Sequence, residues 1–154
     1  MIVVSDTTAL TTLMKAGLQH LLPALFGEVR VPQAVSQELL QFHHALPDWC
    51  VVVSASECPV LDALRIAVDE GEAEAIALAL ELSADFVLLD DKKGRRQAEA
   101  LGLTCLALPA LMVAAKRQGL IPSVAEAFAT LAVKGRYGVA EHTAALLLRS
   151  VGEA

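Results

Sequence analysis

The sequence predicts an α/β fold in which helices cover both faces of a central parallel sheet. Short apolar segments alternate along the chain with longer segments of good helix formers, which is typical of strand–helix–strand units. The short segments are apolar at successive positions, as parallel strands buried on both faces are. The 154 residues suffice for one domain with one sizeable core.

Five short, mostly apolar segments are predicted as strands. In chain order they are residues 2–5, 29–31, 49–53, 86–89 and 104–107. The first lacks the basic residues that open a signal peptide, and it becomes polar at Ser5 and Asp6, so we expect a strand there. In sheets of this kind, functional sites lie beyond the carboxyl ends of the strands.

Nine longer segments are predicted as helices. In order they are residues 7–16, 18–26, 32–41, 59–68, 71–80, 92–101, 109–118, 124–133 and 139–150. Gly17 and Gly102 end the first and the sixth. Pro32 and Pro59 stand at the first position of the third and the fourth, where the missing N–H is tolerated. The fifth contains strong helix formers almost throughout.

Composition narrows the class of protein. The chain is 55% hydrophobic, yet no apolar run is long enough to cross a bilayer, so we expect no membrane partner. A net charge of -6 argues against a protein that holds nucleic acid by bulk charge alone, although metal ions could offset acids locally. Three cysteines without metal-type spacing (Cys50, Cys58 and Cys105) indicate free thiols in a reducing cytoplasm.

Four carboxylates stand at the polar ends of apolar segments. Asp6 and Asp90 each follow a predicted strand, Glu38 lies on the helix that Pro32 opens, and Glu72 lies in the first turn of a helix. One sheet could bring all four to one pocket. A cluster of oxygen ligands suits Mg²⁺ or Mn²⁺, and these ions support phosphate chemistry.

Each acid also has a purely structural interpretation. Asp6 could cap the helix that follows it, a role in which Asp is favoured and which does not prevent metal binding. Glu38, beside the apolar Val35 and Leu39, could be a solvated helix residue. If each acid is considered alone, a structural role explains it better than a place in a metal site.

Helical phase distinguishes Glu72 from its neighbour Glu74. At 100° per residue, Glu72 shares a face with Ile76, whereas Glu74 shares a face with Glu70 and Glu81. We therefore expect Glu74 to be solvated and Glu72 to point toward the site. A glutamate in the first turn would also be favoured by the helix dipole.

The pair Asp90–Asp91 precedes a basic run. We assign Asp90 to the site because it is nearest the end of the strand, and Asp91 to a helix cap or a supporting metal contact. Four of the next five residues are cations, among them Lys92, Lys93 and Arg95. They could form a solvated surface or hold a phosphate backbone.

Together these segments resemble the PIN-domain family, and within it the toxin-like PIN ribonucleases of bacteria and archaea. The motifs are residues 3–8 (VVSDTT), 31–39 (VPQAVSQEL), 71–79 (GEAEAIALA) and 88–96 (LLDDKKGRR). The resemblance covers residues 2 to about 139. It implies a three-layer α/β/α sandwich and a metal-dependent endoribonuclease that uses Mg²⁺ or Mn²⁺.

The resemblance also implies roles and partners. Asp6, Glu38, Glu72 and Asp90 match the catalytic acids, and Thr7 matches a small hydroxyl residue that follows the first of them. RNA is the implied substrate. A small antitoxin protein and a second copy of the chain are the implied partners, since toxin-like relatives are commonly dimers whose antitoxin masks the active site.

The chain also departs from the family pattern. Glu72 stands where many toxin members carry Asp, and the doubled Asp90–Asp91 leaves the fourth position ambiguous. We expect residues 138–154 to form a C-terminal helical extension of the single domain that spans residues 1–154.

The main alternative to a ribonuclease is a PIN-like protein-binding module with weak or lost nuclease activity. A haloacid-dehalogenase-like phosphatase ranks lower, because Thr8 stands where its second acid would be.

The C-terminal helices carry more apolar residues than a small domain needs to bury. Residues 110–120 and 140–148 are rich in Ala, Val and Leu. Exposed apolar surface on them would mark an interface with a partner or a second copy. Alternatively, both helices complete the core.

Overall fold

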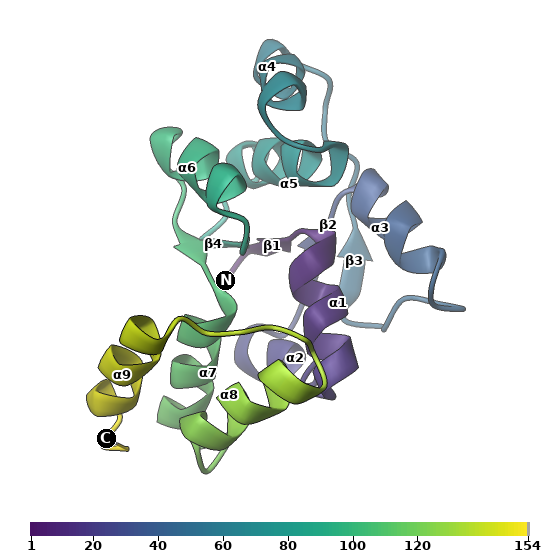
Figure 1. Cartoon of the computed structure of the whole chain (residues 1–154). Helices are drawn as coiled ribbons and strands as arrows, with labels where there is room; N and C mark the ends of the chain where they lie inside the picture. The colour runs from purple at the N-terminus through teal and green to yellow at the C-terminus, as the bar shows by residue number, and fades with distance from the viewer. Residues whose placement is uncertain (154) are drawn as a thin grey trace.

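The computed structural model describes residues 1–153, in which five strands form one all-parallel sheet. The strands are β1 (Val3–Ser5), β2 (Val29–Val31), β3 (Cys50–Val52), β4 (Phe86–Leu88) and β5 (Cys105–Leu106), in the order β3-β2-β1-β4-β5. Helices cover both faces (Figure 1), so the predicted three-layer α/β/α architecture is confirmed.

Nine helices lie within these residues, close to their predicted places. They are α1 (Thr7–Ala16), α2 (Leu21–Phe26), α3 (Gln33–Leu40), α4 (Pro59–Ala67), α5 (Glu70–Glu81), α6 (Lys92–Ala100), α7 (Leu108–Arg117), α8 (Val124–Val133) and α9 (Glu141–Ser150). Helix α2 begins three residues later than predicted, because Leu18 bonds back to Leu13 and closes a turn. Pro32 is the N-cap of α3 and not its first helical residue.

The two faces of the sheet have separate cores. Val3 faces a core made with α1, α2, α7 and α8, whereas Val4 faces one made with α4, α5 and α6. This alternation follows from the period of two in a strand. Small residues let α5 approach closely, since Ala73, Ala75 and Ala79 are buried.

Strand register brings distant acids to one edge. Strand β1 pairs with β4 with Ser5 opposite Leu88, and the Asp6 N–H donates to the Leu88 carbonyl (3.3 Å). Asp6 directly follows β1, and Asp90 follows β4 after Leu89, so both acids leave the sheet at its carboxyl edge.

The expectation of exposed apolar surface on residues 110–120 is wrong for most of α7. Leu111, Met112 and Ala115 are buried and complete the core, because α7 packs against α8 and joins the core on one face of the sheet. No residue of α9 is fully buried. Leu147 and Leu148 pack against the core, and Leu146 remains 51% exposed. Ala154, the last residue of the predicted extension, lies outside the described residues.

No helix described in residues 1–153 combines the length and the hydrophobicity that a bilayer crossing requires.

The Glu153 side chain forms hydrogen bonds with α7 and with the start of α8. Its carboxylate accepts hydrogen bonds from Lys116 Nζ (2.7 Å), the Val124 N–H (2.7 Å), the Ala125 N–H (3.0 Å) and Ser123 Oγ (2.9 Å). Lys116 and these donors at the start of α8 lower the pKa of Glu153 to about 2. A carboxylate at a helix N-terminus is favourably placed toward the helix dipole.

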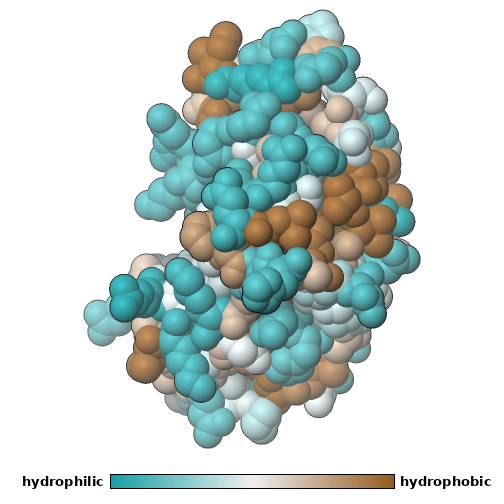
Figure 2. Space-filling model, turned by 90° about the vertical axis from the view of Figure 1, so that its right-hand side faces the viewer, coloured by the Kyte–Doolittle hydropathy of each residue, from teal (hydrophilic) through white to brown (hydrophobic). Residues whose placement is uncertain are grey.

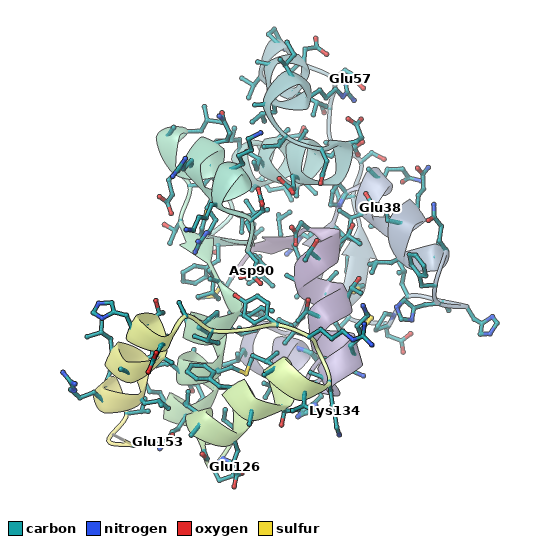
Figure 3. The ribbon with its side chains drawn as sticks, viewed as in Figure 1. Glu38, Glu57, Asp90, Glu126, Lys134 and Glu153 are labelled. Atoms are coloured by element: carbon teal, nitrogen blue, oxygen red, sulfur yellow. The ribbon has the colours of Figure 1, made fainter. Side chains whose placement is uncertain are left out.

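We expect Glu153→Gln to lower the urea midpoint at about pH 7. The native pKa lies below the unfolded value of about 4.3, so the contribution of Glu153 is fully present above that pH and declines as pH falls toward about 2. The difference between variant and wild type should therefore shrink at acid pH. Glu126→Gln is the matched control, because Glu126 is an exposed acid in the first turn of α8, the helix whose start Glu153 contacts (Figure 3). Equal effects of the two substitutions would contradict this role.

Candidate functional site

Asp6 is the most deeply buried acid at the carboxyl edge of the sheet. It is only 2% exposed, and its Oδ1 accepts the Ala9 N–H (3.0 Å) as the N-cap of α1. Burial raises the pKa of Asp6 to about 7, against the lowering effect of the Ala9 bond, and the charges of Asp90, Asp69 and Glu38 raise it further. The cap and the predicted place in the site therefore coexist.

Asp90 lies between the acids and the C-terminal segment. Its Oδ1 accepts the Leu108 N–H (3.2 Å) and the Tyr137 hydroxyl (3.0 Å). Its Oδ2 is buried and has no hydrogen-bond partner among residues 1–153. Burial raises the pKa of Asp90, while the two hydrogen bonds and the Arg95 charge oppose the rise.

Glu38 and Glu72 reach the acid cluster past two glycines. Glu38 Oε1 lies 2.7 Å from the position that a Cβ on Gly71 would take, and Glu72 Oε2 lies 2.9 Å from the corresponding position on Gly94. Real Cβ atoms essentially never come this close, so a Cβ at either glycine would force the glutamate side chain to shift. Gly71 and Gly94 therefore leave the space that the two carboxylates occupy.

A small cavity lies among these residues. It has a volume of about 20 Å³ and is lined by Asp6, Thr7, Thr8, Glu38, Asp69, Gly71 and Glu72. A space of this size holds about one water-sized particle. The Thr7 hydroxyl is buried there without a partner among the described residues.

Glu72 and Glu74 have different surroundings, although not in every respect those that helical phase predicted. Glu72 lines the cavity beside Asp6 and is half-buried. Burial raises its pKa to about 8, with Asp69 next in effect. The expectation that Glu74 is solvated is wrong. Its Oε1 accepts the Ala34 N–H (3.2 Å) in the first turn of α3, the helix that carries Glu38.

Asp69 is an acid of this cluster that the sequence analysis missed. Its carboxylate caps α5 by accepting the Glu72 N–H (2.8 Å), and it lines the same cavity. A signal was present, because Asp69 and Glu72 have the spacing of a capping box at the start of a strong helix. With Asp69, the cluster contains five acids and not four: Asp6, Glu38, Asp69, Glu72 and Asp90.

The basic run begins beside these acids. Asp91 caps α6 through the Gly94 N–H (3.2 Å), which is one of the two roles predicted for it. Lys92 and Lys93 are exposed, and Arg95 is half-buried. None of the salt bridges found among residues 1–153 uses these three cations.

The chemical types of these ligands suit Mg²⁺ or Mn²⁺, but the side chains are not arranged closely enough to bind one. No three His, Cys, Asp or Glu side chains within residues 1–153 are close enough to hold a metal ion as they lie. One reason is that Asp6, Asp69 and Asp91 are turned toward backbone N–H groups. The fit is supported by the oxygen-only donors, the small cavity and the unpartnered Asp90 Oδ2. Side-chain rotations would be needed to complete a site.

A family model described as a PIN domain matches residues 2–153. No curated protein matches the chain.

We expect Asp6→Asn to stabilise the metal-free protein at about pH 8. The folded pKa of about 7 exceeds the unfolded value of about 3.9, so wild-type stability falls as pH rises between these values, because the folded state retains a proton that the unfolded state releases. Asn keeps the cap and avoids this penalty, by at most a few kcal/mol. Thermal unfolding in EDTA measures the gain, which should vanish below about pH 4. Asp91→Asn, an exposed cap, should give no such gain. A destabilised Asp6→Asn protein at about pH 8 would refute this account.

Proposed function

The chain belongs to the PIN-domain family, whose members are typically nucleases, and on this premise we propose that it is a Mg²⁺- or Mn²⁺-dependent endoribonuclease. The observation that supports the proposal most directly is the gathering of acids at one sheet edge. Asp6, Glu38, Asp69 and Glu72 share one small cavity, and the charge of Asp90 reaches Asp6. Such a cluster is stabilised by a bound cation.

In this proposal Asp6, Glu38, Glu72 and Asp90 hold the metal, with Asp91 in support. A bound ion would lower the pKa of a water molecule and offset charge on the phosphate. The protein would supply orientation. Tyr137 and the Leu108 N–H fix one oxygen of Asp90 and leave the other free.

The RNA would be held beside the acids. The unpartnered Thr7 hydroxyl is a hydrogen-bond donor for a phosphate oxygen within the site. Lys92, Lys93 and Arg95 begin α6 next to Asp90 and Asp91, where their charges can bind the sugar–phosphate backbone. This arrangement would offset a net charge of -6 locally.

We further propose that the protein is the toxin of a toxin–antitoxin pair, acts in the cytoplasm and forms a homodimer. Free thiols at Cys50, Cys58 and Cys105 suit a reducing compartment. Figure 2 views the molecule from the side of α3 and shows hydrophobic side chains gathered on that face. Exposed apolar residues there include Leu40 (48%) and Phe42 (77%), and such surface suits a protein partner.

Cleavage of a pooled RNA tests the activity. We expect cleavage with Mg²⁺ or Mn²⁺ and none with EDTA. Asp6→Asn and Asp90→Asn should each reduce the rate by about 100-fold or more, since even the outer partners of metal ligands contribute about 10–100-fold. Asp48→Asn, an exposed residue outside the cluster, is the control. Wild-type protein that binds RNA or a protein partner but cleaves nothing with either metal would favour the alternative, a PIN-like binding module.

Calorimetric Mn²⁺ binding separates Glu72 from Glu74. We expect Glu72→Gln to weaken binding at least about tenfold, because Glu72 lines the cavity. Glu74→Gln should weaken binding less. The Glu74 carboxylate accepts a hydrogen bond from the Ala34 N–H and can affect the site only indirectly, through the position of α3. The reverse order of effects would show that the assignment of the third acid is incorrect.

A further inference from the structure

A second cavity adjoins the acid cluster on the side of the C-terminal segment. It has a volume of about 490 Å³, and we call it the Tyr137 pocket. Its lining includes Asp90, Lys92, Arg95, Pro109, Tyr137 and Leu147. It lies where the segment joining α8 to α9 passes in front of the start of α7 (Figures 1 and 3).

The pocket combines three kinds of surface. Tyr137 supplies an aromatic ring, Pro109 and Leu147 supply apolar contacts, and Lys92 and Arg95 supply positive charge. Neither cation forms a salt bridge among the described residues. The volume falls within the usual range of small-ligand sites, and an apolar pocket with a few charged groups is their usual composition.

Asp90 joins this pocket to the acid cluster. One carboxylate oxygen accepts the Tyr137 hydroxyl, and the other is buried without a described partner. Asp90 is also close enough to Asp6 for its charge to raise the pKa of Asp6. A chain whose phosphate lies at the acids could therefore place its neighbouring nucleotide against Tyr137.

We propose that the Tyr137 pocket binds one unpaired nucleotide of single-stranded RNA, with the base against the Tyr137 ring and a phosphate held by Lys92 and Arg95. This rests on the proposed ribonuclease function. Unpaired bases stack on aromatic side chains while cations follow the backbone, and base-paired nucleotides cannot reach such a pocket. Lys92 and Arg95 favour an anionic ligand over a purely apolar one, and the Tyr137 ring favours a base over an acidic peptide.

The test uses the fact that Tyr137 is the only tyrosine in the chain. Protein labelled with 3-fluorotyrosine has one fluorine resonance, which reports on this pocket. Short single-stranded RNA is added in EDTA, so that binding is observed without cleavage. We expect the resonance to shift, and to shift much less with the same sequence as a duplex.

Two pairs of variants test the contacts by fluorescence anisotropy of labelled RNA in EDTA. Tyr137→Ala removes the ring and should weaken binding about tenfold, in the range measured for single base-stacking contacts. Tyr137→Phe keeps the ring but loses the bond to Asp90, so it should bind RNA nearly as wild type does. Arg95→Gln should weaken binding, while its control Arg117→Gln, on the lining of a different cavity, should not.

The outcomes separate the subsite from the nuclease. If wild-type protein cleaves RNA with metal but its fluorine resonance does not move, the pocket proposal is refuted and the nuclease stands. If Tyr137→Ala and Tyr137→Phe lose RNA affinity equally, Tyr137 only positions Asp90. That result also refutes the pocket proposal. A shifted resonance without any metal-dependent cleavage would support the pocket and contradict the nuclease. If the resonance does not shift and no RNA is cleaved, both proposals are contradicted.

Discussion

Carboxylates that gather at the edge of a parallel sheet repel one another, and the surrounding structure must offset that repulsion. The pairing of β1 with β4 brings Asp6 and Asp90 to the same edge of the sheet. Three helices then begin at this edge, and each is capped by an acid: Asp6 for α1, Asp69 for α5 and Asp91 for α6. Helix N-termini offset negative charge only in part. Burial raises the pKa values of Asp6 and Glu72 most, and the charges of neighbouring acids raise them further, so part of the repulsion remains.

The same edge depends on two positions without side chains. Gly71 follows Asp69 in the first turn of α5, and Gly94 lies in the first turn of α6. A methyl group on either would meet a carboxylate oxygen, of Glu38 at Gly71 and of Glu72 at Gly94. The sequence shows these glycines inside helices, where glycine is unfavourable by about 1 kcal/mol relative to alanine. The close approach of the glutamates explains why glycine fits there.

Local signals predicted the fold and part of the candidate site. The apolar strands and the strand-end acids Asp6 and Asp90 follow from rules that operate within a few residues, and so does the phase of Glu72. Asp69 carried a local signal too, but its place immediately before the helix made it look like a connecting residue. Glu74 was misjudged because its partner, Ala34, is forty residues away in sequence.

Tyr137 could not be found from the sequence. It lies between α8 and α9, outside any helix or strand, and its partner Asp90 is 47 residues away. No periodicity or motif connects the two. The burial of α7 was equally hidden, since an apolar helix looks the same in sequence whether a second helix covers it or a partner does.

A series of hydrogen bonds that begins and ends at Asp90 connects the C-terminal residues to the acid cluster. Asp90 accepts the Leu108 N–H at the start of α7, and Lys116 near the end of that helix binds Glu153. Glu153 also caps the start of α8.

Beyond the other end of α8, the Tyr137 N–H donates to the Leu131 carbonyl (2.9 Å), and the Tyr137 hydroxyl returns to Asp90. Since α7 and α8 pack against each other, a contact at Glu153 helps to set the position of the Tyr137 ring at the far end of both helices. Residues 138–153 therefore help to shape the pocket beside Asp90, although their sequence alone had suggested only an extension of the domain.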